Sequence, residues 1–386
     1  VTVDTEGRPQ PNRAVRVLVY DRKWVTTKES TPDGARRYRS DPVDTLIETL
    51  SVTTDAKGLG SVSFTPKTTG TIRLVAEITD DRGRTTRSAT YLWVAGAGEA
   101  SWRISNDDII QLVADKERYE IDETAQVLVP TPFEGATGLV TVERGKILTR
   151  EVRDFPTTST TISIPITAKS VPNVFVSTVL YRPPTATDPV PRYKVGYVEL
   201  PVSTATRALN VEVKSDRDQA KPGDTVRYTV RVTDSAGKGV RAEVSAAVVD
   251  KAVLSLAEDR SQTGLAAFWF ERGLGVTTTS SMAVSLNRSN DVISEPRQGG
   301  KGGGGLEDDR LRQEFKNTAF WAPQLVTKDD GTLTVDVKLP DNLTTWRFQA
   351  RAVSGDTLVG EGTNELMSTQ PLLLRPALPR FLRVGD

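Results

Sequence analysis

The stretch VRYTVRVTDSAGKGVRAEVSAAVVD, residues 226–250, decides the fold class. Its first seven residues alternate between apolar and polar side chains, which is the period of a β-strand with one buried face. In the turn TDSAGKG that follows, Asp and Gly supply backbone conformations that end a strand. A second apolar-rich segment, AEVSAAVVD, comes directly after it. The stretch therefore predicts two consecutive strands separated by a tight turn.

The same pattern recurs along the chain, and long helical periodicity is almost absent. Four more strands are predicted: VRVLVY (15–20), GSVSFTP (60–66), TIRLVAEI (71–78) and LTVDVKL (333–339). The turn sequences TDAKG, TDDRG and TKDDG separate strands in the same way. Regularly spaced strands of this kind predict an all-β protein built of tandem, fibronectin-III-like antiparallel β-sandwiches.

The chain also repeats itself. ADKERYEIDETAQVLV from Ala114 resembles SDRDQAKPGDTVRYTV from Ser215, about one sandwich of ~100 residues later. Residues 53–78 resemble residues 326–350, and the segment from Gly7 resembles the segment from Gly237. These echoes predict several copies of one module.

The echoes also suggest module boundaries. Residue 1 matches a point near Val232, so the first module is expected to lack its opening strands, and the chain, which does not start with Met, is expected to be part of a longer protein. The predicted divisions are a partial sandwich over 1–98, a sandwich over 99–206, a third over 207–370 and the first strand of a fourth over 371–386.

The third module is longer than a sandwich of ~100 residues needs. Its surplus lies between the strands 242–250 and 318–326, and we predict an insertion over about 257–316. Within it, TGLAAFWFERGLG (263–275) suggests a short helix with aromatic anchors that ends at a glycine. The polar, glycine-rich remainder buries too little apolar area to offset its ordering entropy, so we predict an unstructured segment inside one sandwich.

The insertion offers cleavage sites to proteases of several specificities, since proteases cut extended, mobile chain. Basic and apolar residues alternate with glycine in RQGGKGGGGLEDDR (297–310) and around it. The candidate cleavage residues are Leu286, Arg288, Val292, Arg297, Lys301, Leu306, Arg310 and Arg312.

Composition excludes several classes of site. The chain has no Cys and no His, so disulfides, thiol nucleophiles, Ser-His-Asp triads and Cys- or His-ligated metals cannot form within it. The 50 basic and 50 acidic residues balance, which gives no sign of a nucleic-acid partner. We expect no catalytic residues, no cofactor and no metal; Asp107–Asp108 and Asp329–Asp330 are read as turns rather than Ca²⁺ ligands.

Individual aromatic residues are given structural roles. Trp321 and Trp346 lie in alternating strands and are predicted to be core anchors. Three consecutive aromatics occupy 268–270, and at least one of them is expected to pack on the sandwich. Residues 340–342, Pro-Asp-Asn, are predicted to form a turn.

Several strings resemble the alpha-2-macroglobulin family, in particular its bacterial members. VSAAVVDKAVLSL (244–256) resembles the strand that precedes the family's bait region, and FKNTAFWAPQLVTKDDGTLTVDVKLPDNLTTWRFQARAVS (315–354) resembles the strands that follow it. QPLLLRPALPRFLRVGD (370–386) resembles the start of the next macroglobulin-like module. The likeness is strong over 207–386 and is one of module pattern over 1–206.

The resemblance implies a broad-spectrum protease inhibitor rather than an enzyme. In the family, a protease cuts the bait region, the surrounding macroglobulin-like sandwiches rearrange, and in most members a Cys–Gln thioester in a later domain then captures the protease. With no Cys in this chain, the thioester is expected beyond Asp386. The implied partners are proteases of several classes and the remaining domains of the same protein, and the implied location is the periplasm or cell envelope of a bacterium.

Two other functions fit the sequence. A structural or adhesive array of sandwiches on a cell surface would carry the same modules, with the glycine run as a mere exposed loop. A carbohydrate-processing enzyme with accessory β-modules fits less well, because no paired-carboxylate motif stands out.

Overall fold

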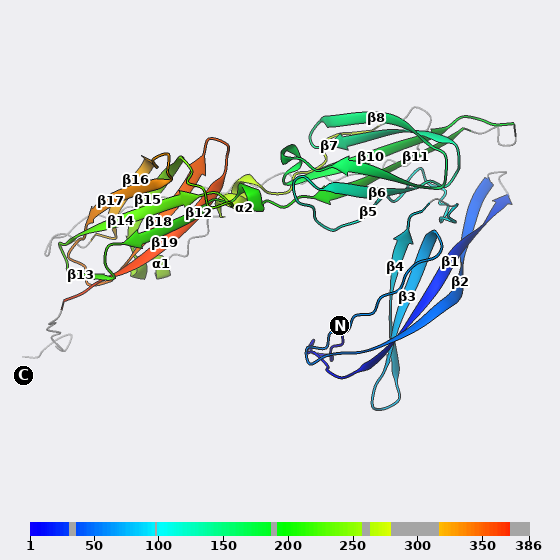
Figure 1. The fold of residues 1–386 in the computed structure, drawn as a ribbon, viewed down its shortest axis with the longest axis horizontal. Coiled ribbons are helices and arrows are strands. Elements are labelled where there is room, and N and C mark those ends of the chain that lie inside the picture. Colours follow the sequence, from blue (N-terminus) through cyan, green and yellow to red (C-terminus); the bar gives the residue numbers. More distant parts are fainter. Residues whose placement is uncertain (31–35, 97–98, 187–190, 257–262, 279–315, 371–386) are drawn as a thin grey trace, which may run out of the picture. The chain divides into compact units, whose positions relative to one another are not determined.

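A computed structural model describes residues 1–30, 36–96, 99–186, 191–256, 263–278 and 316–370 (Figure 1). These residues form antiparallel β-sheets with a few short helices, as predicted for the fold class. The chain divides into two compact units, one made of residues 1–203 with 271–289 and the other of residues 204–270 with 290–386. Each unit is described separately below.

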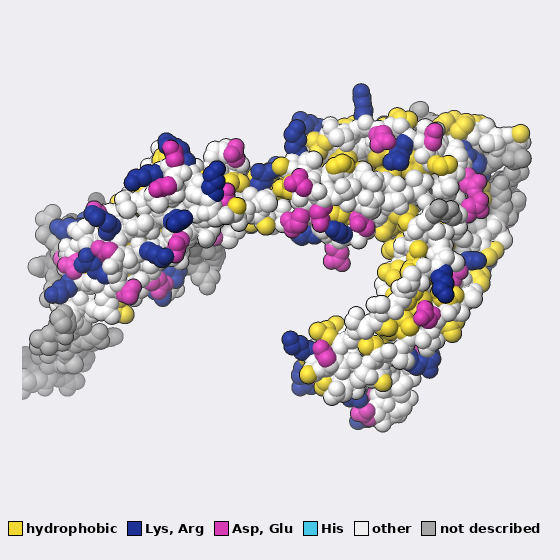
Figure 2. Space-filling model, in the orientation of Figure 1, with side chains coloured by type: hydrophobic (Ala, Val, Ile, Leu, Met, Phe, Trp, Pro, Cys, Tyr) yellow, Lys and Arg dark blue, Asp and Glu magenta, His cyan; other side chains and the backbone are white. Residues whose placement is uncertain are grey.

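The first unit begins with a four-stranded sheet. Its strands are β1 (Ala14–Ser30), β2 (Arg36–Thr53), β3 (Gly70–Thr79) and β4 (Thr85–Val94), in the order β2-β1-β3-β4. Val19 and Ile72 are buried, but many apolar side chains stay exposed along this sheet, as Figure 2 shows.

The strand predicted at residues 60–66 is wrong, because the structure assigns no strand there. Its counterpart in the repeat is β17 (Thr332–Lys338), which pairs with β14 (Thr225–Thr233). Among the described residues, 60–66 join none of the sheets, and an alternating segment without a hydrogen-bonding neighbour does not form a ladder.

The first unit continues with a complete sandwich (Figure 1). One of its sheets has the order β5-β6-β9 and the other β11-β10-β7-β8. Phe155, Ile162 and Leu180 are fully buried in it. The strands are β5 (Val113–Ala114), β6 (Thr124–Pro130), β7 (Ala136–Glu143), β8 (Ile147–Phe155), β9 (Ser159–Pro165), β10 (Asn173–Arg182) and β11 (Arg192–Pro201), with a 3₁₀-helix η1 (Ala168–Ser170) before β10.

The second unit is also a sandwich. A three-stranded sheet, β12-β14-β17, packs on a five-stranded sheet, β13-β19-β18-β15-β16, and both contribute to one core. Within that core the rings of Tyr228 and Phe348 lie 4.6 Å apart beside the buried Trp346. The strands not yet bounded are β12 (Asn210–Ser215), β13 (Gln219–Ala220), β15 (Ala242–Asp250), β16 (Thr318–Val326), β18 (Thr345–Ser354) and β19 (Val359–Ser368), and a 3₁₀-helix η2 (Ala205–Arg207) precedes β12.

The described part of the chain contains two short α-helices. Helix α1 (Lys251–Leu256) continues directly from β15, and α2 is Gly264–Phe268. The helix predicted over 263–275 is thus confirmed only in its first part. It ends at Phe268, before the glycines that were expected to end it. The Trp269 amide still donates to the Leu265 carbonyl at 2.8 Å, whereas the Trp269 side chain binds the Thr357 carbonyl.

The repeats predicted from the sequence appear as one sheet order used three times. Strand orders β4-β3-β1-β2, β11-β10-β7-β8 and β19-β18-β15-β16 place corresponding strands of the three modules in corresponding positions. In the second module β7 and β8 are joined by the turn Arg144–Lys146. The segment between β15 and β16 takes the place of that hairpin turn in the third module.

The two tryptophans predicted as core anchors differ. Trp346 on the inner strand β18 is fully buried, which confirms the prediction. Trp321 is 65% exposed, so its assignment to the core is wrong. It lies on β16, which comes last in its sheet order and, among the described strands, pairs with β15 alone.

Candidate functional site

The eight candidate cleavage residues, Leu286, Arg288, Val292, Arg297, Lys301, Leu306, Arg310 and Arg312, all lie between residues 279 and 315, outside the described residues. The structure does describe both ends of the insertion and the surfaces they contact. These ends form the candidate site. The sequence predicted the bounds of the insertion and a short helix with aromatic anchors over 263–275, but not the contacts that hold the two ends.

The insertion leaves and re-enters one sheet between neighbouring strands. Strands β15 and β16 are antiparallel, with Val248 opposite Phe320 and Val249 opposite Thr318. One step further, the Asp250 amide donates to the Asn317 carbonyl at 2.9 Å. The two ends are therefore hydrogen-bonded to each other at the base of the insertion.

The Asp250 carboxylate joins several segments at this base. It is 7% exposed and accepts hydrogen bonds from Thr344 Oγ1 at 2.7 Å and from the Ala252 amide at 2.9 Å. Asn342 Nδ2 lies 3.4 Å from both Asp250 Oδ2 and the Lys316 carbonyl. One buried carboxylate thus connects β15, the start of α1 and the loop before β18, and Asn342 extends the network to Lys316, two residues before β16.

Sequence reasoning missed Asp250 and treated Asn342 only as a turn residue. A signal was available, because Asp250 is a carboxylate at the end of an apolar strand, where the chain leaves the sheet. A buried carboxylate needs several donors, and Asn342 and Thr344 follow in the loop that the sequence predicted as a turn.

Outside the buried network, Lys251 and Arg347 each lie 2.7 Å from Glu365 on β19. The Lys251 ammonium and then the Arg347 guanidinium hold the pKa of Glu365 below its ordinary value. These pairs link the start of α1 to two strands of the sheet, although ion pairs at the surface contribute little to stability.

Helix α2 fixes the upstream part of the insertion on the second unit. Thr263 Oγ1 accepts from the Ala266 amide at 3.3 Å as its N-cap. At its other end Trp269 Nε1 donates to the Thr357 carbonyl at 3.0 Å, and the Arg207 guanidinium lies 4.6 Å from the indole ring. The expectation that one of the aromatics 268–270 packs on the sandwich is confirmed by Trp269.

Residues 271–275, here called the strap, belong to the first unit. The side-chain amide of Asn173, the first residue of β10, holds the strap through a complementary pair of hydrogen bonds. The Arg272 amide donates to Asn173 Oδ1 at 3.0 Å, and Asn173 Nδ2 donates to the Arg272 carbonyl at 2.8 Å. The Gly145 amide, in the β7–β8 turn, donates to the Leu274 carbonyl at 2.7 Å. Asn173 and Gly145 are called the dock below.

The dock is held rigidly by its own sandwich. Arg144, next to Gly145, donates to the carbonyls of Lys169, Val171 and Asn173 at 2.9, 2.7 and 3.0 Å. Burial lowers the pKa of the Arg144 guanidinium, and the positive charge of Arg272 adds to this effect. The turn that meets the strap is therefore fastened to the start of β10.

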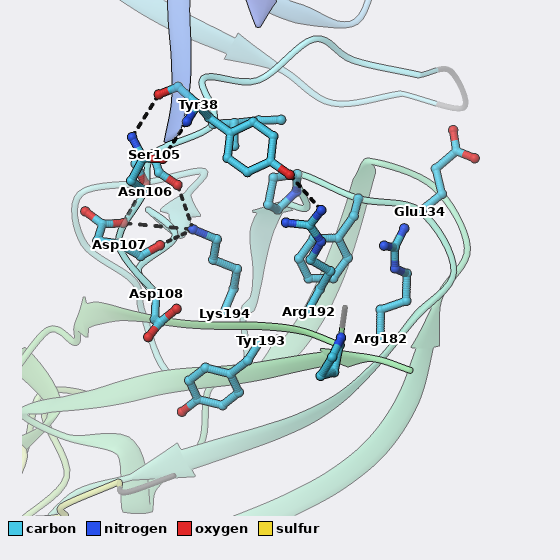
Figure 3. Close-up of a pocket in the computed structure, with 14 residues that line it drawn as sticks. Tyr38, Ser105, Asn106, Asp107, Asp108, Glu134, Arg182, Arg192, Tyr193 and Lys194 are labelled. Carbon is cyan, nitrogen blue, oxygen red and sulfur yellow. Dashed lines mark hydrogen bonds and ion pairs between the residues drawn. The ribbon is translucent and has the colours of Figure 1, made fainter. Parts of the chain in front are cut away.

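A hollow of about 520 Å³ lies in the first unit between residues 104–108 and the ends of β10 and β11 (Figure 3). Lys194, 8% exposed, points its ammonium group at the carbonyl oxygens of Ser105 and Asp107, and Arg192 Nη2 donates to Tyr38 Oη at 2.6 Å. Burial lowers the pKa of Lys194, with Asp107 opposing. These contacts join residues 104–108 to the start of β11.

The described residues offer neither an acidic metal site nor a membrane-spanning helix. In the ranges that the structure covers, no three Asp or Glu side chains are grouped so that they could hold a metal ion. Nor does any helix in those ranges have the length and apolarity needed to cross a bilayer.

Comparison with protein families bears directly on the insertion. The sequence model described as "Alpha-2-macroglobulin bait region domain" matches residues 110–256, and the model described as "Alpha-2-macroglobulin family" matches residues 318–386. The two matches thus end and begin at the two sides of the insertion.

Curated relatives and a solved structure are similar to this chain over most of its length. An alpha-2-macroglobulin homolog of Nostoc sp. is 28% identical over all of this chain and 21% of its own length, and the alpha-2-macroglobulin of Ralstonia nicotianae is 26% identical over 92% of this chain and 23% of its own. The chain thus spans about a fifth of the length of these curated relatives. The crystal structure of Salmonella alpha-2-macroglobulin reacted with methylamine is 18% identical, with a TM-score of 0.42, over 97% of this chain and 22% of that one.

Proposed function

Because the chain belongs to the alpha-2-macroglobulin family, in its bacterial type, we propose that it is the bait-bearing segment of a protease trap. In this proposal the insertion at 257–316 is the bait region, and proteases of several classes cut it at the basic and apolar residues named above. The cut changes the conformation of the surrounding sandwiches and leads to capture of the protease. The chain acts as a substrate and inhibitor, not as an enzyme.

The observation that carries the proposal is the hydrogen-bonded base of the insertion. Asp250 and Asn317 join its two ends, and β15 and β16 are neighbours in the sheet. A cut in the insertion therefore breaks a peptide bond without removing a strand from the frame. A protease trap needs an insertion that is easily cut and a sandwich that stays folded after the cut.

Solved relatives support proteases as partners. One structure is that of trypsin-activated alpha-2-macroglobulin from Escherichia coli, and another is that of the E. coli protein activated by porcine elastase. Trypsin cuts after basic residues and elastase after small apolar ones. The insertion of this chain offers both kinds, with Arg297 and Lys301 as examples of the first and Val292 of the second.

The remaining steps of the proposal lie outside this chain. Covalent capture through a Cys–Gln thioester needs a cysteine, which this chain lacks, so another domain of the same protein would supply it. We also propose a location outside the cytoplasm, in the periplasm or cell envelope, where foreign proteases are met. Fractionation of the source cells would test the location.

Limited proteolysis tests the function. The intact protein is treated with low doses of several unrelated proteases, the first cut is mapped by mass spectrometry, and the hydrodynamic radius is followed by light scattering. The trap predicts first cuts between about Val284 and Arg312 with each protease, followed by a change in radius. Scattered first cuts, or clustered cuts with an unchanged radius, would favour the alternative of a structural or adhesive array.

A further inference from the structure

The chain that leads into the bait region is fixed twice before residue 279. Trp269 is held on the second unit by Thr357 and Arg207. Only a few residues later, the strap is held on the first unit by Asn173 and Gly145. The crossing from one unit to the other falls between Phe270 and Glu271.

The dock recognises the strap backbone rather than its side chains. The amide of Asn173 presents one donor and one acceptor to a single residue, as a neighbouring β-strand would. Asn173 is fully buried, and its Nδ2 also donates to Glu199 Oε1 at 2.7 Å. A buried amide requires partners, and here the strap supplies one for its oxygen.

Glycine at position 275 is required for the docked geometry. Gly275 has φ +62°, in the left-handed region, and a Cβ atom at that position would lie 2.9 Å from the Gly145 Cα. Two backbones therefore touch at this point. Gly273, two residues earlier, has open space around it, and its φ lies outside the left-handed region. The two glycines of the strap thus form a matched pair for substitution.

We propose that the dock positions the upstream end of the bait region and that cleavage acts by releasing the strap. This inference rests on the proposed function. In the intact chain, the strap lies between two fixed points, Trp269 on one side and the Asp250–Asn317 base on the other. An undocked strap therefore remains part of a loop that is closed at both ends. After a cut between 279 and 315 the downstream side becomes a free end, so undocking gains conformational entropy and the strap leaves the dock.

Asn173 is a positioning residue in this scheme, and the base at Asp250 stays closed throughout. The two anchors should therefore respond differently to one cut. The hydrogen bonds between the strap and the dock should be lost. The β15–β16 pairing should persist, because the rest of the sheet supports it. This difference distinguishes strap release from a general loosening of the structure.

Hydrogen exchange measured by mass spectrometry or NMR on the full chain tests the proposal. A recognition sequence for a highly specific protease, placed within residues 299–305, lets the cut be made whether or not natural proteases choose this region. We expect the Arg272 and Gly145 amides to exchange about tenfold faster or more after the cut, as their hydrogen bonds are lost. The Asp250 amide should exchange at an unchanged rate.

Substitutions in the strap give the second arm, measured on uncut protein. Gly275→Ala should accelerate exchange at Arg272 and Gly145 by a similar factor without touching the sandwich core, and Gly273→Ala should leave both rates unchanged. Asn173→Ala should act like Gly275→Ala, but it also removes the donor to Glu199. The decisive variant is therefore Gly275→Ala, which changes only the strap.

The proposal is overturned if the Arg272 and Gly145 amides keep their protection after the specific cut, or if the two glycine variants behave alike. Failure of the proposed function would look different. Natural proteases would then make their first cuts outside 279–315, while the engineered cut and the glycine pair would still report on the dock.

Discussion

Asp250 illustrates how one residue defines the base of the insertion. Its carboxylate is buried and yet fully engaged, because Thr344, Ala252 and Asn342 all donate to it. If either the carboxylate or its donors are removed, the partner that stays buried has no hydrogen bond. The resulting loss of stability is larger than the net contribution of the hydrogen bonds themselves.

Replacing Asp250 should therefore weaken the second unit. Asp250→Ala leaves the Thr344 hydroxyl and the Ala252 amide without their acceptor, and we expect a loss of about 2–3 kcal/mol in the free energy of unfolding. Urea denaturation followed by tryptophan fluorescence measures it. The control is Asp329→Ala, at a side chain that is 91% exposed in a surface turn, for which a change within about 0.5 kcal/mol is expected. Equal effects of the two variants would contradict the assigned role.

Asp44 gives a prediction of pH dependence in the first sheet. The Arg22 guanidinium, bidentate at 2.6 and 2.7 Å, is the main cause that holds the pKa of Asp44 below its ordinary value; Arg73 at 3.0 Å adds to it and partial burial opposes it. A lowered pKa in the folded state means that the ion pair contributes stability above the unfolded-state pKa of about 3.9. That contribution is lost as the pH falls through the folded-state value.

Asp44→Asn should accordingly cost about 1 kcal/mol near pH 7, a modest amount because water reaches the pair. The difference between the variant and the natural protein should shrink as the pH is lowered below about 4. Thermal unfolding of both proteins across pH 2.5–7 in ~0.15 M salt is the measurement. A difference that stays constant down to the lowest pH would show that the charge of Asp44 is not its cause.

At the scale of single strands, alternation located four of the five segments that it predicted. The segments 15–20, 71–78, 226–232 and 333–339 lie in or overlap β1, β3, β14 and β17. Alternation reports which face of a segment is apolar, but not whether a hydrogen-bonding neighbour exists. That is why 60–66 was predicted as a strand and is not one, and why Trp321 on β16 was placed in the core.

The position of a strand in its sheet should decide how much the tryptophan on it contributes to the free energy of unfolding. Trp346 lies on the inner strand β18 and is fully buried, whereas Trp321 lies on the outermost strand β16 and is 65% exposed. Trp346→Ala should cost about 3–5 kcal/mol, and Trp321→Ala less than about 1 kcal/mol. The midpoints of chemical denaturation for the two variants give the comparison. A large loss for Trp321→Ala would mean that its outer face is covered.

Across the whole molecule, the module echoes in the sequence predicted repeated modules, and three of the sheets share one strand order. The contacts of the base and of the dock were not predicted, because they join residues far apart in the chain; at the base, only the position of Asp250 at the end of an apolar strand was open to sequence reasoning. Asn173 and Arg272, for example, meet through a fold that brings β10 and the strap together. The eight candidate cleavage residues were chosen on chemistry alone and stay a prediction.

A cut in the insertion should leave the second unit assembled. The upstream fragment would carry β12–β15 and the downstream fragment β16–β19, yet both contribute to one core, in which Val244 and Val248 lie with Trp346 and Phe348. We expect the two fragments to co-elute in size-exclusion chromatography and to separate only in denaturant. Dissociation of the two fragments in native buffer would contradict the view that the second unit stays folded after the cut.

The most direct test of the central claim, that the insertion and not the frame is what proteases attack, is deletion of residues 279–315 and their replacement by a short Gly-Ser linker. The strap, β15 and β16 remain in this variant. The account predicts an unfolding temperature within a few degrees of the natural protein and a rate of first cleavage by trypsin and by elastase that falls at least tenfold. Cleavage at an unchanged rate, or a variant that no longer folds, would contradict it.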